Sequence, residues 1–133
     1  MELILAKDVS NTRLDQFLLN NQDVDKSLLT EKGYVVQIDE QIEGCFVLDA
    51  MENGVHWLKK LHVTKQAAHG LPVIIESILT IAKENQATCV YVHSHQPLVD
   101  ILLESLQFRP QKDVKIVNIP ENSNGHWWAY DVS

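Results

Sequence analysis

Hydrophobic and polar residues alternate with a period of two through the middle of the chain. Three segments share this pattern: 34–38, 42–50 and 55–64. They are separated by turn residues at Asp39-Glu40 and around Asn53-Gly54. Such alternation is typical of strands, and Asn-Gly is a strong signal for a hairpin. The pattern therefore predicts a meander of three antiparallel strands.

Beyond position 70 the apolar residues follow a helical spacing instead. Segments 71–85 and 97–106 each carry a proline near the start, where a helix needs no N–H donor. Between them, residues 88–94 form a compact run of β-branched and aromatic residues, which is typical of a strand. A strand–helix–strand connection forms a parallel pair, so we expect segments 55–64 and 88–94 to lie side by side.

The two ends of the chain complete the expected sheet. The N-terminal segments are a short strand over 2–7, a helix capped by Ser10 and a short helix over 25–31 ended by Gly33. Segments 114–119 and 126–132 are expected to form a closing hairpin. The predicted fold class is α/β (α+β): a mixed twisted sheet with an antiparallel meander, then a parallel βαβ with flanking helices and a C-terminal hairpin.

Composition narrows the classes of protein that the chain can be. Its 133 residues suit one domain over 1–133, and 45% hydrophobic with 22% charged residues is ordinary globular usage. A net charge of −7 would repel nucleic acid and anionic membrane surfaces, so we expect neither as a partner. No apolar run approaches the roughly 20 residues that span a bilayer. With an acidic start and no signal-peptide pattern, we expect a cytoplasmic protein.

Two stretches of the chain carry a family resemblance. They are Leu61-His62-Val63 with the loop 64–70 and helix 71–83, and the segments 87–92 and 102–108. These stretches look like motif A followed by motif B of the GNAT superfamily of N-acetyltransferases, and the order of elements is also that of the family. The resemblance extends from about 34 to 108, with both ends fitting in outline. It implies a GNAT-like fold.

The resemblance also implies a binding site for acetyl-CoA. In the family, a loop of the form Arg/Gln-x-x-Gly-x-Gly/Ala enters a helix whose amides hold the pyrophosphate. In one register Gln66 takes the first position and His69 and Leu71 the two small ones; the other register matches Lys65, Ala68 and Gly70. Side chains at glycine positions would crowd a phosphate and weaken binding. The implied cofactor-binding residues are Leu61, His62 and Val63 for the pantetheine arm, Ala68, His69, Gly70 and Leu71 for the pyrophosphate, and Gln96 at the family's Asn position.

No catalytic residue can be assigned from the sequence. The family's proton-donating Tyr corresponds to Leu103, which cannot donate a proton. His93 and His95, at a strand end, are alternatives as a general base or as surface histidines. A metal pair would need a third ligand, and we predict no metal site. Cys45 and Cys89 lie in apolar, strand-like runs and are expected to be buried thiols.

Two functions remain open. The resemblance implies an acetyl-CoA-dependent N-acetyltransferase acting on an unidentified small-molecule or peptide amine. The alternative is a catalytically impaired GNAT-fold binding or regulatory module that uses Trp127 or Trp128 in a contact, including that of a homodimer. An unrelated α/β binding domain is a third reading. The acidic residues of the meander, such as Glu43 and Asp49, are either solvated turn charges or attract a cationic amine.

Overall fold

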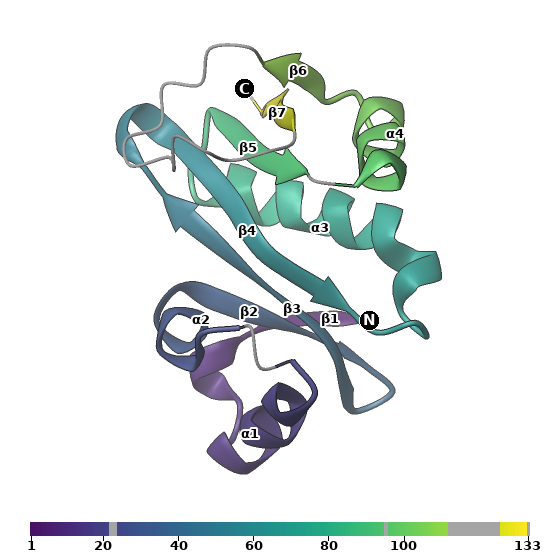
Figure 1. Ribbon diagram of the computed structural model, residues 1–133. Helices are drawn as coiled ribbons and strands as arrows, with labels where there is room; N and C mark the ends of the chain where they lie inside the picture. The colour runs from purple at the N-terminus through teal and green to yellow at the C-terminus, as the bar shows by residue number, and fades with distance from the viewer. Residues whose placement is uncertain (22–23, 95, 112–125, 133) are drawn as a thin grey trace. The chain divides into compact units, whose positions relative to one another are not determined.

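The computed structural model describes residues 1–21, 24–94, 96–111 and 126–132 (Figure 1). Within them the helices are α1 (Asn11–Leu19), α2 (Lys26–Lys32), α3 (Leu71–Glu84) and α4 (Pro97–Ser105). The strands are β1 (Glu2–Leu5), β2 (Gly33–Ile38), β3 (Gln41–Ala50), β4 (Val55–Val63), β5 (Cys89–Ser94), β6 (Arg109–Gln111) and β7 (His126–Asp131). Short 3₁₀ turns are η1 (Ala6–Asp8), η2 (Glu52–Gly54) and η3 (Ala68–Gly70).

The strands of the described residues form one mixed sheet of seven, in the order β1-β2-β3-β4-β5-β7-β6. The pairs β1–β2, β2–β3, β5–β7 and β6–β7 are antiparallel. Strands β4 and β5 are parallel, with a register that runs from Val55 opposite Cys89 to Leu58 opposite Val92. The predicted mixed α/β fold, with its parallel pair around a helical crossover, is therefore confirmed.

The chain divides into two compact units, each built from separate stretches of sequence. The first unit comprises 1–49 and 59–77, and the second comprises 50–58 and 78–133. Strand β4 and helix α3 contribute residues to both units. A single domain over 1–133 stays a prediction.

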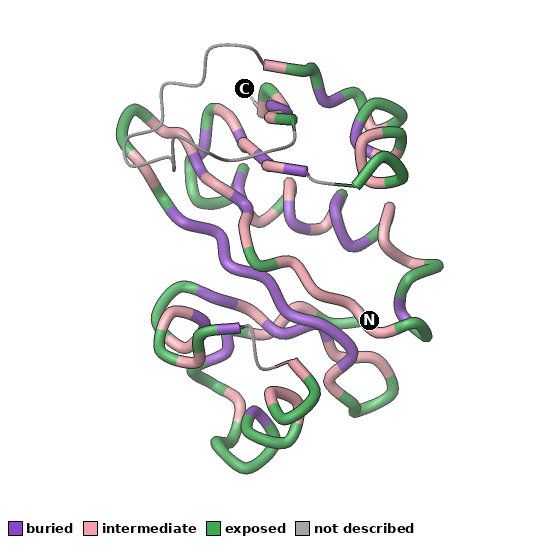
Figure 2. The backbone as a smooth tube through the Cα atoms, in the orientation of Figure 1, coloured by how far each residue is buried: buried purple, intermediate pink, exposed green. Residues whose placement is uncertain are grey.

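In the first unit, α1 and α2 cover one face of the sheet. The Ser10 side chain accepts a hydrogen bond from the Arg13 N–H at 3.3 Å, and Asp25 caps α2 in the same way. These caps satisfy amides that have no partner within the helix. Leu14 and Leu29 pack in a core cluster with alternate residues of the strands, among them Val35, Cys45 and Val47. Residues 43–49 of β3 are buried throughout (Figure 2).

In the second unit, β5 alternates between a buried and a half-buried face. Val90, Val92 and Ser94 are buried, whereas the residues between them are half-buried. Trp128 is buried and its Nε1 donates a hydrogen bond to Asp100 Oδ1 at 2.8 Å, whereas Trp127 is half-buried. The prediction that the two adjacent tryptophans face opposite sides is confirmed, with Trp128 in the core.

Several elements differ from the sequence prediction. The first strand ends at Leu5, where the 3₁₀ turn η1 begins. The C-terminal hairpin differs in its first strand: within the described residues β7 pairs with β5 and with the short strand β6, and the predicted strand 114–119 lies outside the described residues. Because proline has no N–H to donate and is rare within strands, the segment around Pro110 was not predicted to be a strand. No helix among the described residues is long and apolar enough to cross a membrane.

Candidate functional site

The predicted pyrophosphate loop forms a tight turn between β4 and α3 in the first unit. The Ala67 N–H donates to Thr64 Oγ1 at 3.3 Å and to the Thr64 carbonyl at 3.1 Å. The Gly70 N–H donates to the Ala67 carbonyl at 3.0 Å, and the Leu71 N–H to the Ala68 carbonyl. The chain thus satisfies several of the turn's amides itself, which leaves fewer of them for a bound anion than the sequence motif implies.

The space around Gly70 and the charges near it suit an anionic group. A Cβ built on Gly70 meets no atom within 4 Å, so the protein leaves room there for a ligand. Helix α3 is 14 residues long, and its first turn contains no acidic residue to oppose the positive end of the helix dipole. Lys65 is exposed on the turn and brings a cationic group to it, and His69 is exposed beside Gly70. Pro72 removes one amide donor. The room at Gly70 and the charge of Lys65 are compatible with an anionic group, whereas the role of Ala68, His69, Gly70 and Leu71 in holding a pyrophosphate stays a prediction.

The strand that leads into this turn has an irregular backbone. Leu61, His62 and Val63 are all half-buried, and Lys60 just before them has a left-handed φ of 57° in the middle of β4. Strand β3 approaches this segment closely, since a Cβ on Gly44 would lie 2.7 Å from the His62 carbonyl oxygen. Because Gly44 has no side chain, the main chain of residues 61–63 can lie close against β3.

A pocket of about 440 Å³ in the first unit lies beside the same segment of chain. Its lining comes from α1, from the hairpin between β2 and β3, and from Thr64, and includes Arg13, Phe17, Asn20 and Glu43. The expectation that Glu43 and Asp49 are solvated turn charges is wrong: they are only 8% and 9% exposed. We call this cavity the α1 pocket.

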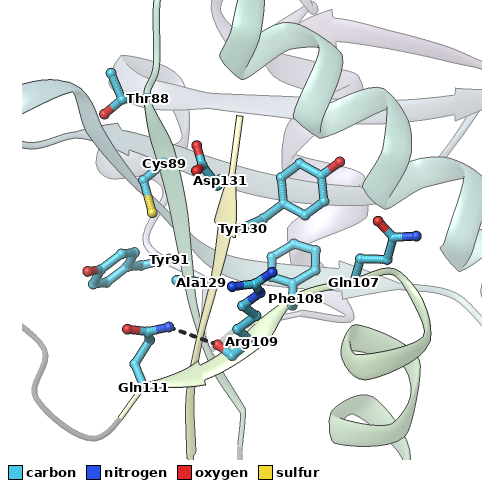
Figure 3. A pocket seen from close by; sticks show the side chains of 10 residues that line it. All are labelled: Thr88, Cys89, Tyr91, Gln107, Phe108, Arg109, Gln111, Ala129, Tyr130 and Asp131. Atoms are coloured by element: carbon cyan, nitrogen blue, oxygen red, sulfur yellow. Dashed lines mark hydrogen bonds between the residues drawn. The ribbon is translucent and has the colours of Figure 1, made fainter. Parts of the chain in front are cut away.

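The second unit contains a larger cavity of about 700 Å³ (Figure 3). It is lined by side chains of β5, β6, β7 and the residues before β6, with Cys89, Tyr91, Phe108, Arg109 and Tyr130 among them. Burial, together with the charge of Asp131, raises the pKa of the Cys89 thiol, and burial also raises the pKa of Tyr91. Cys89 therefore stays a protonated thiol near neutral pH and is a poor nucleophile.

Comparison with known proteins bears on the fold. No protein-family model and no curated protein matches this sequence. Among solved structures, a GNAT-family acetyltransferase from Staphylococcus aureus Mu50 has a TM-score of 0.73 at 14% identity, with 99% of each chain covered. An acetyltransferase from Bacillus subtilis in complex with CoA has a TM-score of 0.70 at 16% identity, with 98% of this chain and 97% of that chain covered.

The chain has the GNAT fold. N-acetylglutamate synthase from Neisseria gonorrhoeae matches all of this chain with a TM-score of 0.70 at 11% identity, but only 36% of that longer protein is covered. At these identities the likeness establishes the fold, and function rests on the site.

The residues that the GNAT resemblance singles out divide between the two units. Leu61, His62, Val63, Ala68, His69, Gly70 and Leu71 belong to the first unit, and Gln96 belongs to the second. Gln96 is the exposed N-cap residue of α4, with its N–H donating to Ser94 Oγ at 3.3 Å. Leu103, at the family's Tyr position, is 1% exposed and part of the core. Its side chain fills the interior and supplies no acid.

The structure places His93, one of the two histidines considered as a general base, against an aromatic ring. The His93 ring is half-buried and its centroid lies 4.7 Å from that of Trp127, whose ring also approaches Trp57. His95 lies outside the described residues. In the part of the chain that the structure describes, no group of three or more His, Cys, Asp or Glu side chains is arranged to hold a metal ion.

Proposed function

We propose that this chain is a divergent GNAT acetyltransferase that transfers an acetyl group from acetyl-CoA to an amine. The observation that carries the proposal is the match to acetyltransferases over nearly the full length of both chains, one of them in complex with CoA. Room at Gly70 and the exposed Lys65 on the turn support a cofactor role for the turn. A cytoplasmic location stays a prediction.

In this proposal the chain acts mainly by binding and orientation. Acetyl-CoA supplies a thioester that an amine can attack. The turn Ala68–Leu71 holds the pyrophosphate, and the main-chain groups of Leu61–Val63 line the pantetheine arm. Holding two reactants in a reactive geometry contributes much of the rate of such a transfer, so the absence of a proton donor at Leu103 slows the reaction without abolishing it.

The first test compares two substitutions at Gly70 by calorimetric titration with acetyl-CoA. Gly70→Ala should fold as the unmodified chain does, because its Cβ meets no protein atom within 4 Å, and its small methyl group should weaken binding less than a larger, charged side chain. Gly70→Glu places bulk and negative charge where the pyrophosphate should lie and should weaken binding by about tenfold or more. Equal binding by both variants, or no heat from the unmodified chain, would refute the proposed cofactor site.

A second candidate is a binding or regulatory module that has kept the fold without the chemistry. The buried Leu103 and the turn amides already used within the chain favour it. It predicts self-association or partner binding, with the half-buried Trp127 as the residue to test, and no acetylation of any amine. Sedimentation of a monomer together with measurable acetyl transfer would rule this module out.

A further inference from the structure

A series of hydrogen bonds connects strand β3 with Gly70 through the turn that leads into α3. The Thr64 hydroxyl donates to a carboxylate oxygen of Glu43 and accepts from the Ala67 N–H at 3.3 Å. The Ala67 carbonyl accepts from the Gly70 N–H at 3.0 Å. All four residues belong to the first unit. The carboxylate of Glu43 is therefore connected to the residue around which the protein leaves room for a ligand.

The Glu43 end of this series lies at an irregularity of the sheet. The register of β3 against β2 shifts by one residue just before Gly44, so Glu43 is the extra residue of a β-bulge. Bulges redirect side chains and are frequent near binding sites. Glu43 is buried and contacts Thr64 twice: its main-chain carbonyl accepts from the Thr64 N–H at 2.9 Å, and its carboxylate accepts from the hydroxyl. The two contacts fix both the main chain and the side chain of Thr64.

The partners of the Thr64 hydroxyl also determine which way it donates. A hydroxyl both donates and accepts, whereas an ionised carboxylate only accepts and an amide N–H only donates. The hydroxyl proton therefore points to Glu43, and a lone pair faces the Ala67 N–H. That N–H also donates to the Thr64 carbonyl at 3.1 Å, so the main chain closes the turn and the side chain adjusts its geometry. A hydrogen bond to a charged acceptor is stronger than a neutral one, which favours a single orientation.

We propose that Glu43 and Thr64 are positioning residues that hold residues 68–71 in the geometry that binds the pyrophosphate of acetyl-CoA. This inference rests on the proposed function. Neither residue needs to touch the cofactor, because Thr64 acts on Ala67 and Ala67 acts on Gly70. A turn that is already ordered loses less conformational freedom when a ligand binds, and this raises the affinity for the part of the ligand that it contacts.

Four substitutions in the full chain separate the hydrogen bonds from packing and from charge. Thr64→Val keeps the shape of the side chain and removes both hydrogen bonds of the hydroxyl, whereas Thr64→Ser keeps the hydroxyl and removes a methyl group. Glu43→Met removes the acceptor at a similar length, whereas Glu43→Gln keeps an acceptor oxygen and removes the charge. The matched control is Thr12→Val, because Thr12 is exposed on α1.

Two ligands measured by calorimetry distinguish a positioning role from a general loss of structure. Acetyl-CoA carries the pyrophosphate, whereas S-acetylpantetheine lacks it together with the nucleotide. Thr64→Val and Glu43→Met should each weaken acetyl-CoA binding by about tenfold and leave S-acetylpantetheine binding unchanged. Thr64→Ser, Glu43→Gln and Thr12→Val should bind acetyl-CoA normally. The double variant should bind no more weakly than Thr64→Val alone, because both substitutions break the same connection.

Amide hydrogen exchange followed by NMR tests the same connection in the ligand-free chain. Exchange at Ala67 and Gly70 should be about tenfold faster in Thr64→Val and in Glu43→Met, and normal in Thr64→Ser. Unchanged exchange at these two amides would show that the side chains do not order the turn, and would overturn the inference.

The binding data keep failure of this inference apart from failure of the proposed function. Normal acetyl-CoA binding by Thr64→Val, or equal weakening of acetyl-CoA and S-acetylpantetheine, would overturn the positioning role and leave the proposed function intact. No binding of acetyl-CoA by the unmodified chain would refute the proposed function, and the inference with it.

Discussion

Glu43 and Asp49 are carboxylates of the same strand with nearly equal exposure and different surroundings. Glu43 faces a pocket and a hydroxyl, whereas Asp49 receives hydrogen bonds or charge from Lys32 at 2.9 Å and Lys59 at 3.0 Å. From the sequence both are acidic residues of a meander. Their tertiary partners distinguish them: Asp49 is paired with two lysines, whereas Glu43 lines a pocket and has no cationic partner among the described residues.

The pairing of Asp49 has a consequence for acid stability. Burial alone would raise the pKa of Asp49, but the hydrogen bonds and charges of Lys32 and Lys59 outweigh it and lower the pKa below its ordinary value. A lowered folded-state pKa gives stability that is present above the unfolded value and is lost as the pH falls through the folded value. We expect Asp49→Asn to lose about 1 kcal/mol at neutral pH, after allowance for solvent screening around the partly exposed lysines.

Urea unfolding at a series of pH values measures this effect. The gap in unfolding free energy between Asp49→Asn and the unmodified chain should close as the pH drops below the ordinary Asp range. A constant gap from neutral to strongly acidic pH would mean that the side chain acts by packing and not by charge.

At the scale of elements, local signals in the sequence were sufficient to predict most of the helices and strands. Ser10 and Asp25 cap α1 and α2 as local chemistry requires, and the alternation over 34–64 located β2, β3 and β4. The bulge at Glu43 and the left-handed Lys60 were not predictable, because both depend on how neighbouring strands pair. The α1 pocket was missed for the same reason, since its walls come from segments far apart in sequence.

Gly44 illustrates how one element fixes another. Its missing Cβ lets β3 approach the His62 carbonyl and the Val63 side chain, where an added methyl would lie 2.7 Å and 3.1 Å away. We expect Gly44→Ala to lower the unfolding free energy by about 1–3 kcal/mol and to weaken acetyl-CoA binding by displacing 61–63. Urea unfolding and calorimetry check this, with Gly70→Ala as the unhindered comparison. Unchanged stability and affinity in the Gly44→Ala variant would show that the strands adjust freely.

For the whole molecule, the question is whether its two compact units behave as one domain. Strand β4 and helix α3 each supply residues to both units, so neither unit can lose its structure without breaking an element of the other. We therefore expect a single two-state thermal transition. In scanning calorimetry, the van't Hoff enthalpy of unfolding should equal the calorimetric enthalpy. Two separated transitions would identify the units as independent domains.

The bulge at Glu43 also bears on how such a protein can change over evolutionary time. The bulge consists of one extra residue, so loss of a single codon would restore a regular ladder between β2 and β3 and would remove the carboxylate at the same moment. Cys45 and Val47 of the surrounding core cluster would keep their places opposite β2, whereas the Thr64 N–H, which donates to the Glu43 carbonyl, would need a new acceptor. A lineage can thus gain or discard this charge in one mutational event that leaves Cys45 and Val47 in register with β2.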